Sequence, residues 1–311
     1  MTMTQLRAFL ALAEAGSFAG AANGTGLSQT SVHRAVGDLE HMIGGKLVER
    51  RGRVVWLNSA GKNLARGARL AFSELSAAIA DLGITRSGGN ELISFGALPL
   101  ARPFLVPAAM GEMARIEPRA SFKVLEGSWR ELVEPLRDGA IDMIVGAIRP
   151  YEIADLYQMP LFEDRLVIVA GNRHPLRDEA KPTLEQLRAF PWILPPRNTP
   201  LRETWNQLFE GQDLPATPIE CGSVMIIGRL LTEGNFLTLL SPDQVALQIR
   251  SGLLTRIGQP LENSSRRVGI TTRRSWRPTA VQYRFLELLK QKAREVETGA
   301  EEPHRRRTEW A

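Results

Sequence analysis

Residues 3–61 read MTQLRAFLALAEAGSFAGAANGTGLSQTSVHRAVGDLEHMIGGKLVERRGRVVWLNSAG, and this stretch decides the fold of the N-terminal part of the chain. Its apolar residues recur at helical spacing in three short blocks. The blocks carry Leu6, Phe9, Leu10 and Ala13, then Phe18, Ala21 and Ala22, then Val32, Val36, Leu39 and Ile43. Ser17 and Ser28 precede the second and third blocks, where a hydroxyl can cap a helix, and Gly16 and Gly44 stand where helices end. The stretch therefore predicts three short helices.

A hairpin with a basic tip is predicted after the third helix. Two β-prone runs, 46–50 and 54–57, flank the turn Arg51-Gly52-Arg53. Arg50, Arg51 and Arg53 gather at this tip, where their charge suits contacts with DNA phosphates or with the minor groove.

The polar face of the third helix carries side chains that can read base edges. Glutamine bridges N6 and N7 of adenine, arginine bridges O6 and N7 of guanine, and serine or threonine reaches bases or phosphates. The capped start of the helix adds backbone donors for a phosphate. The candidate DNA-binding residues are Ser28, Gln29, Thr30, Ser31, His33, Arg34, Arg50, Arg51 and Arg53. Gly37 lies on the same face, and its cost of about 1 kcal/mol in helix stability suits a close approach to DNA. Spacing alone leaves open an ordinary polar face in a small helical bundle.

A long helix is predicted from residue 59 to about 82, with Asn58 or Ser59 as its cap. Its apolar positions alternate in steps of four and three: Leu64, Ala68, Ala71, Leu75, Ala78 and Leu82. A heptad seam of this kind requires a partner helix and predicts dimerisation. The Ser-Gly-Gly sequence within 86–90 predicts a hinge.

From residue 91 the pattern changes to alternating strands and helices, which predicts an α/β domain with largely parallel sheets after the all-α start. The candidate strands are 92–97, 121–125, 141–146, 165–170, 191–194, 217–221, 236–240, 253–257 and 267–272. Capping boxes begin at Ser128, Thr183 and Ser241, and Thr199 precedes a proline at the first helical position.

Ligands of open α/β sheets bind beyond the carboxyl ends of the strands, at helix starts. This rule selects the candidate ligand-binding residues Leu98, Pro99, Leu100, Arg102, Ser128, Trp129, Gly146, Ala147, Arg149, Thr199 and Ser223. For any one of the hydroxyl residues, ordinary helix capping is the alternative interpretation.

Composition and charge narrow the class of protein. The chain has 311 residues, 43% of them hydrophobic, which supports about two packed domains. No apolar run is long enough to span a membrane. Residues 1–69 hold the whole net charge of +5, which suggests a polyanionic partner. The single cysteine, Cys221, excludes an intramolecular disulfide, is predicted to be a buried strand residue and favours a cytoplasmic location.

Enzymatic chemistry has no support in the sequence. The motifs of serine hydrolases, P-loops, dinucleotide sites and zinc proteases are missing, and the histidines at 33, 41, 174 and 304 are scattered. Asp142 and His174 are predicted to be structural. We therefore expect no enzyme activity, no metal and no cofactor.

The opening stretch resembles the winged helix-turn-helix of LysR-type transcriptional regulators, and the likeness extends over nearly the whole chain. The matching positions include Phe9, Ala13-Glu14, Gly16-Ser17-Phe18, Ala21-Ala22, Ser28-Gln29, Leu39-Glu40, Gly44, Leu47, Arg50, Leu57 and Ala60-Gly61. Thr25, His33 and Val48 depart from the family pattern, in which leucine, serine and phenylalanine are usual. His33 lies on the reading face, so the resemblance implies an altered base preference there.

The resemblance also implies a domain organisation. It predicts a winged helix-turn-helix over 1–58, a linker helix for dimerisation over 59–86, and an effector-binding domain over 87–294. This domain would have two lobes like a type II periplasmic binding protein, the first over about 91–162 and 267–294 and the second over about 163–266. Residues 295–311 would form a flexible tail.

Segments such as PLFEDRLVIVA (160–170) and PWILPPRNTPLR (191–202) resemble the branch named for the galactose-binding-protein regulator. This likeness implies a sugar or small acid as effector between the lobes. Arg102 and Arg149 would compensate for Leu98, Pro99 and Leu100, which stand where hydroxyl residues are common in the family.

The expected function is transcriptional regulation controlled by that effector. A tetramer made of two dimers would bind an interrupted palindrome in double-stranded DNA and contact RNA polymerase. The alternative is a solute-binding protein without enzymatic activity.

Overall fold

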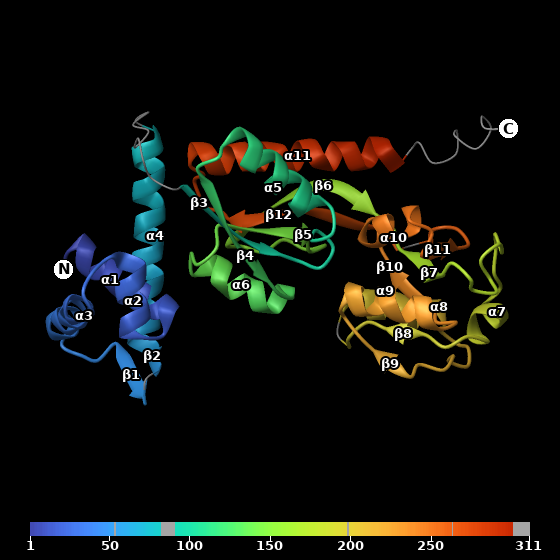
Figure 1. Cartoon of the computed structure of the whole chain (residues 1–311), viewed down its shortest axis with the longest axis horizontal. Coiled ribbons are helices and arrows are strands. Elements are labelled where there is room, and N and C mark those ends of the chain that lie inside the picture. Colours follow the sequence, from blue (N-terminus) through green and yellow to red (C-terminus); the bar gives the residue numbers. More distant parts are fainter. Residues whose placement is uncertain (53, 82–90, 198, 263, 301–311) are drawn as a thin grey trace. The chain divides into compact units, whose positions relative to one another are not determined.

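The computed structural model describes residues 1–52, 54–81, 91–197, 199–262 and 264–300. The chain opens with the three predicted helices, α1 (Met3–Ala15), α2 (Phe18–Thr25) and α3 (Gln29–Ile43) (Figure 1). Ser17 caps α2 through the backbone N–H of Gly20 at 3.1 Å, and Gly16 ends α1 with a φ of 61°. Their core buries Phe9, Leu12 and Leu39 completely. Ile43, expected in this core, is 46% exposed because it is the last residue of α3.

Two departures from the family pattern are accommodated locally. The hydroxyl of Thr25 donates a hydrogen bond to the carbonyl of Ala21 at 2.7 Å, so it is satisfied within α2. Val48 is half-buried and packs against the N-terminal core. Neither residue disrupts the helix-turn-helix.

The predicted hairpin consists of β1 (Val48–Arg51) and β2 (Val54–Leu57), which pair antiparallel with Arg50 opposite Val55. The N–H of Val55 donates to the carbonyl of Gly16 at 2.8 Å, which fixes the hairpin to the turn between α1 and α2. Arg53 and the side chain of Arg51 lie outside the described residues.

The long helix α4 (Ser59–Asp81) follows, and Asn58 caps it by accepting the N–H of Gly61 at 2.9 Å. The first half of the predicted seam packs on the N-terminal core, with Ala68 buried and Leu64 half-buried. In the second half, Leu75 is 45% exposed and Ala71 and Ala78 are also exposed. This exposed apolar stripe is the kind of surface that a partner helix covers, so dimerisation stays a prediction. Leu82 and the expected hinge lie outside the described residues.

From Glu91 onwards strands alternate with helices, as predicted. In chain order the elements are β3 (Glu91–Ala97), α5 (Leu105–Ile116), β4 (Ala120–Glu126), α6 (Trp129–Arg137), β5 (Met143–Ala147), β6 (Leu156–Asp164), β7 (Val167–Gly171), α7 (Leu184–Arg188), β8 (Ile193–Leu194), α8 (Pro200–Leu208), β9 (Ile219–Glu220), α9 (Val224–Glu233), β10 (Thr238–Leu240), a 3₁₀ turn (Pro242–Val245), α10 (Ala246–Arg250), β11 (Leu254–Ile257), β12 (Arg266–Arg273) and α11 (Ala280–Ala300).

A five-stranded sheet has the strand order β4-β3-β5-β12-β6. Strand β6 is absent from the sequence-based strands. It contains Pro160, and it forms the edge of the sheet, where proline is tolerated because one side of the strand needs no ladder partner. The sequence pattern did not predict β6, because the strand contains a proline and its apolar and polar residues do not alternate regularly.

A three-stranded sheet has the order β10-β7-β11, and both pairs are antiparallel. The expectation of largely parallel sheets is therefore wrong here. Strands β10 and β11 point the same way because the 3₁₀ turn and α10 carry the chain back between them, but β7 lies between the two and runs opposite. The alternation of helices and strands predicted the parallel crossover from β10 to β11. It did not predict that β7 would lie between these two strands.

The described chain divides into two compact units. One comprises Met1–Gly96, Arg119–Ile144 and Thr272–Tyr283, and the other comprises Ala97–Pro118, Val145–Thr271 and the chain from Arg284 onwards. Helix α11 extends to Ala300, so residues 295–300, which the sequence predicted to lie in the tail, are helical. Among the described residues, no helix combines the length and the apolarity that crossing a membrane requires.

Candidate functional site

The reading face of α3 is exposed as the sequence predicts. Ser28 caps the helix by accepting the N–H of Ser31 at 3.1 Å, and its hydroxyl lies 2.8 Å from that of Ser31. The face opposite the buried Val32, Val36 and Leu39 leaves its side chains open to solvent. The exposed residues are Gln29, Thr30, Ser31, His33, Arg34 and Gly37. Their donors and acceptors are available for base edges in a major groove.

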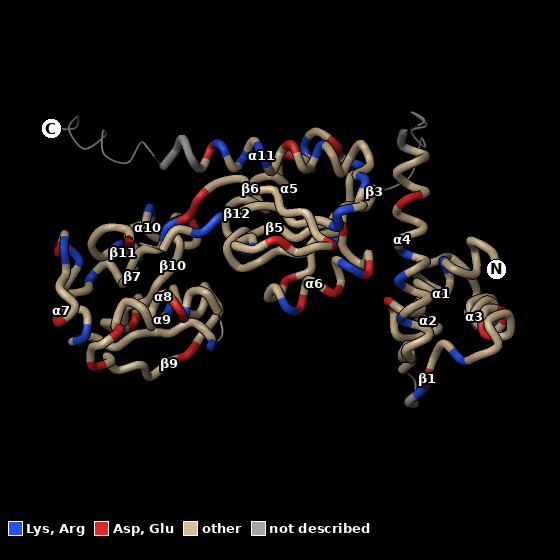
Figure 2. The backbone as a smooth tube through the Cα atoms, turned by 180° about the vertical axis from the view of Figure 1, so that it is seen from behind, with Lys and Arg blue, Asp and Glu red and all other residues tan. Residues whose placement is uncertain are grey.

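The hairpin is attached to the C-terminal half of this helix through Glu40. Its carboxylate accepts the N–H of Leu47 at 2.9 Å and pairs with the ammonium of Lys46 at 2.7 Å. Burial alone would raise the pKa of Glu40, but the hydrogen bonds from Lys46, Leu47 and Val48 lower it overall. Figure 2 shows basic residues on the chain leading into β1 and on β1 itself. The reading helix and the basic hairpin are therefore joined by an ionised side chain.

Arg50, predicted to contact DNA from the hairpin, is exposed and also contacts α2 and α3. Its guanidinium carbon lies 4.8 Å from the ring centroid of Phe18, and one of its amino groups is hydrogen-bonded to the imidazole of His33. Sequence reasoning missed this contact, because Phe18, His33 and Arg50 belong to three different elements.

The loop that follows β3 lies against the end of β5. Leu98 N–H donates to the carbonyl of Val145 at 2.9 Å, and a Cβ on Gly146 would lie 2.5 Å from the Cβ of Leu98. Gly146 also has a φ of 145°, a conformation that side chains rarely adopt. Leu98 and Leu100 are buried, whereas Pro99 is exposed and Ala147 is half-buried. The loop after β3 and the end of β5 are thus tightly packed where they carry these predicted effector residues.

The two arginines predicted to attract an anion are partly engaged within the protein. Arg102 donates from Nε to the carbonyl of Ala97 at 2.9 Å, which braces the turn after β3. Arg149 is half-buried, and burial lowers the pKa of its guanidinium. The backbone N–H of Arg149 donates to the side-chain oxygen of Gln158 at 2.7 Å.

The loops after β8 and β9 form a second pair, because these strands are parallel and their carboxyl ends share one edge. Thr199 and Ser223 cap α8 and α9 at these ends, as predicted. The Thr199 hydroxyl accepts the N–H of Arg202 at 3.3 Å and donates to the carbonyl of Pro196 at 2.7 Å. Cys221 is a half-buried loop residue just beyond β9, so its assignment to a buried strand is wrong.

Ser128 and Trp129 begin α6 in the other unit. The carboxylate of Glu131 accepts both the N–H and the hydroxyl of Ser128, each at 2.7 Å. The predicted capping role is confirmed. The hydroxyl proton of Ser128 is used in the hydrogen bond to Glu131. Trp129 is half-buried.

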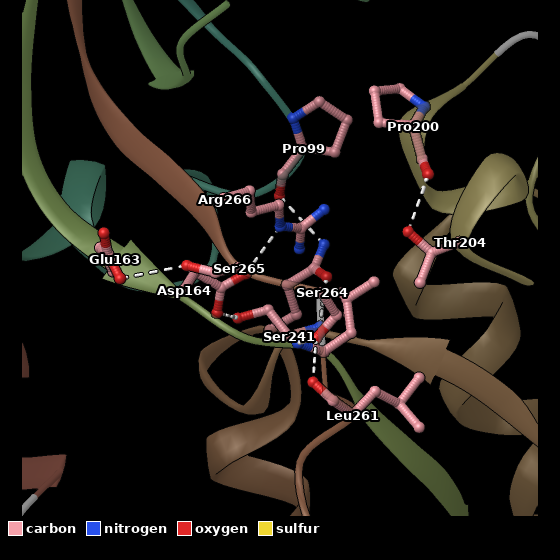
Figure 3. A network of polar contacts seen from close by, with 12 residues as sticks. Pro99, Glu163, Asp164, Pro200, Thr204, Ser241, Leu261, Ser264, Ser265 and Arg266 are labelled. Carbon is pink, nitrogen blue, oxygen red and sulfur yellow. Dashed lines mark hydrogen bonds and ion pairs between the residues drawn. The ribbon is translucent and has the colours of Figure 1, made fainter. Parts of the chain in front are cut away.

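Asp164 forms a buried polar network that sequence reasoning missed (Figure 3). Its carboxylate accepts the hydroxyl of Ser241 at 2.6 Å and the Nε–H of Arg266 at 2.7 Å. Next to Ser241, the side chain of Gln244 donates to the carbonyl of Pro99 at 3.4 Å. The network therefore connects the chain at the end of β6 and the start of β12 with the predicted effector loop. Asp164 and Arg266 lie 102 positions apart and no spacing rule relates them.

Two residues singled out as structural occupy polar positions, of which that of His174 is buried and that of Asp142 is half-buried. Asp142 accepts from Gln282 at 2.9 Å and lies 3.9 Å from Arg273; burial raises the pKa of its carboxyl, although Arg273 opposes the shift. His174 accepts the N–H of Leu176 on Nδ1 at 3.1 Å, and burial lowers the pKa of its imidazole. Both structural predictions are confirmed by these contacts.

Comparison with known proteins assigns the chain to a family. Residues 3–62 match the family described as bacterial regulatory helix-turn-helix protein, lysR family, and residues 86–294 match the LysR substrate binding domain. The chain therefore belongs to the LysR family of transcriptional regulators.

Curated relatives carry regulatory names. The chain is 29% identical to the HTH-type transcriptional regulator GalR of Pseudomonas putida, over 86% of this chain and 68% of that protein. It is 33% identical to the SDS degradation transcriptional activation protein of a Pseudomonas species, over 81% and 83% of the two chains. Because these relatives are regulators, the alternative of a pure solute-binding protein is set aside.

Solved structures share the fold over most of the chain. A full-length OxyR variant from Pseudomonas aeruginosa has a TM-score of 0.70 at 24% identity and covers 94% of this chain and 95% of its own. CbnR, a LysR family transcriptional regulator, has a TM-score of 0.62 at 21% identity and covers 94% and 99%. The helix-turn-helix followed by an α/β substrate-binding domain is therefore the established fold class.

Proposed function

We propose that α3 enters the major groove of an interrupted palindrome and that Gln29, Arg34 and His33 read its bases. Ser28, Thr30 and Ser31 contribute from the capped start of the helix, and Arg51 and Arg53 contact phosphates. The observation that carries this proposal is the exposed polar face of α3, which Ser28 caps and Glu40 joins to the hairpin. A pair of such helices in a dimer would match two half-sites one helical turn apart.

We propose that the substrate-binding domain responds to a sugar or a small acid. The candidate contacts remain Leu98, Pro99, Leu100, Arg102, Ser128, Trp129, Gly146, Ala147, Arg149, Thr199 and Ser223. The packing of the loop after β3 on the end of β5 and the paired loops after β8 and β9 support a binding site at strand ends. A panel of hexoses and small carboxylic acids can be screened for binding to the protein. The affinity of Ser128→Ala and of Thr199→Ala for a compound that binds is then compared with that of the wild type. Unchanged affinity in both variants would show that these two residues do not belong to the site.

Effector control requires that the ligand bind two states of the protein with different affinity. We propose that effector binding changes the angle between two dimers of a tetramer in the cytoplasm, and with it DNA bending and contact with RNA polymerase. The exposed second half of the α4 seam supports the dimer. The proposal assigns no catalytic step and no cofactor to the chain.

Footprinting of the purified protein on the DNA flanking its own gene, at two salt concentrations, tests the proposal. We expect a protected stretch with two separated half-sites, whose protection weakens at high salt because phosphate contacts release counterions. Absence of protection at low salt by folded protein would overturn it.

A further inference from the structure

His33 on the reading face of α3 is held by two residues from two other elements. Its ring stacks on Phe18 of α2, with centroids 4.3 Å apart and an angle of 18° between the planes. Its Nε2 is hydrogen-bonded to a terminal nitrogen of Arg50 in β1. The Arg50 guanidinium also lies over the Phe18 ring, 4.8 Å from its centroid. We call Phe18, His33 and Arg50 the His33 cluster.

The backbone keeps these elements in place independently of the side chains. The N–H of Val55, the residue opposite Arg50 in the hairpin, donates to the carbonyl of Gly16, two positions before Phe18. Phe18 itself is 8% exposed and belongs to the N-terminal core. The imidazole therefore stacks on a ring that the core holds fixed, beside a strand that the same core anchors.

The contact with Arg50 determines which ring nitrogen of His33 accepts a hydrogen bond. A guanidinium has only donors, so Nε2 of His33 must be the acceptor. An imidazole that accepts at Nε2 is neutral and carries its proton on Nδ1. His33 therefore offers an N–H donor, and it does so from an exposed position of the reading face.

We propose that Arg50 is a positioning residue that holds His33 as a neutral Nδ1–H donor, and that His33 is thereby a specificity-determining residue for a hydrogen-bond acceptor on a DNA base edge. The inference rests on the proposed function, because α3 must lie in a groove for His33 to meet a base. Acceptors suited to it are N7 of a purine and O6 of guanine. This role differs from a phosphate contact by Arg50, since the cation–π contact and the imidazole already engage its guanidinium.

The test starts from duplexes selected by the full-length protein from a random-sequence pool, followed by binding measurements with each base of the selected site replaced. His33→Phe keeps the stacking on Phe18 without a ring nitrogen, and Arg50→Met keeps the aliphatic stem without a donor. We expect both variants to lose discrimination at the same base position, by about threefold to tenfold, the range for one hydrogen bond. The double variant should lose no more than His33→Phe alone, and Arg50→Lys should retain part of the discrimination.

A further readout separates a base contact from a phosphate contact. We expect the salt dependence of Arg50→Met to equal that of the wild type, whereas loss of a phosphate contact would lower the slope of log K against log salt by about one.

Arg34→Ala distinguishes a failure of the inference about His33 from a failure of the proposed function. If the pool yields a site and Arg34→Ala loses discrimination, while His33→Phe and Arg50→Met weaken all sequences equally with a lower salt slope, the inference is overturned and the proposed function stands. If the pool yields no preferred sequence, the proposed function and the inference both fail.

Discussion

The carboxylate of Glu40 accepts the backbone N–H of Leu47 at 2.9 Å, seven residues further along the chain. This hydrogen bond joins the last turns of α3 to the strand that carries Arg50. The lowered pKa of Glu40 shows that the folded protein favours its ionised form. A helix that reads bases and a hairpin that supports it are thus held in one geometry.

Removal of this contact should loosen the N-terminal domain. We expect Glu40→Ala to lower the free energy of unfolding by about 2 kcal/mol, because it removes a charge-assisted bond and leaves the N–H of Leu47 without its acceptor. Glu40→Gln keeps an acceptor oxygen and should cost about half as much. Chemical denaturation of both variants measures the difference, and equal costs would contradict the role of the charge.

Glu40 also predicts a pH dependence. Because the folded state lowers its pKa, the stabilisation is complete above the unfolded value of 4.5 and is lost as pH falls through the folded value. Unfolding measured across the acid range should therefore show a smaller loss in Glu40→Gln than in the wild type. If the free energy of unfolding fell equally with pH in Glu40→Gln and in the wild type, groups other than Glu40 would cause the loss of stability in acid.

Gly37 separates stability from DNA binding. A Cβ at this exposed position of α3 would meet nothing within 4 Å, so Gly37→Ala should stabilise the free protein by about 1 kcal/mol. If this face approaches DNA closely, the same change should weaken DNA binding. Gly111→Ala, at an equally open position of α5, is the matched control and should stabilise without an effect on DNA. Unchanged DNA affinity in Gly37→Ala would contradict the docking of this face.

Gly146 tests the packing of the predicted effector loop. We expect Gly146→Ala to cost about 2–4 kcal/mol, because the new Cβ would lie 2.5 Å from that of Leu98 and the φ of 145° disfavours a side chain. Leu98→Gly in the same chain removes the clash and not the backbone strain. The destabilisation of the double variant should therefore be smaller than the sum of the destabilisations of Gly146→Ala and Leu98→Gly, measured by thermal unfolding. Strict additivity would show that residues 98 and 146 do not contact each other.

His174 predicts destabilisation by acid in the substrate-binding domain. Its imidazole is 4% exposed, packs on Phe190 with a centroid distance of 4.4 Å, and accepts the N–H of Leu176. Because burial lowers its pKa below 6.5, the unfolded state takes up a proton first and stability falls as pH decreases below that value. His174→Asn keeps an acceptor and cannot titrate, so its unfolding free energy should change less between about pH 7 and about pH 5. An identical pH slope in both proteins would assign the effect to another group.

The sequence predicted the local structure better than the long-range polar contacts. Caps at Ser17, Ser28 and Thr199 follow from short spacing rules, and the structure confirms them. Strand β6 was missed because an edge strand tolerates Pro160 and shows no regular alternation. The periodicity of a helix indicates which face is buried, but a residue at its end such as Ile43 escapes that rule.

The polar clusters could not be predicted, because their members are distant in sequence. Asp164 meets Arg266, and His33 meets Arg50, through the arrangement of whole elements. The charge and type of these residues did not indicate their partners. His33 did stand out as a departure from the family pattern on the reading face, and this was the one signal that pointed to its cluster.

The base-by-base affinity of Arg34→Ala on the footprinted site tests the central claim most directly. If α3 reads the major groove, Arg34→Ala should lose about 1–3 kcal/mol of discrimination at one or two base positions. Arg51→Ala, the matched control from the hairpin, should weaken every sequence alike and reduce the salt slope. Equal losses on the specific site and on random DNA for Arg34→Ala would contradict the assignment of α3 as the reading helix.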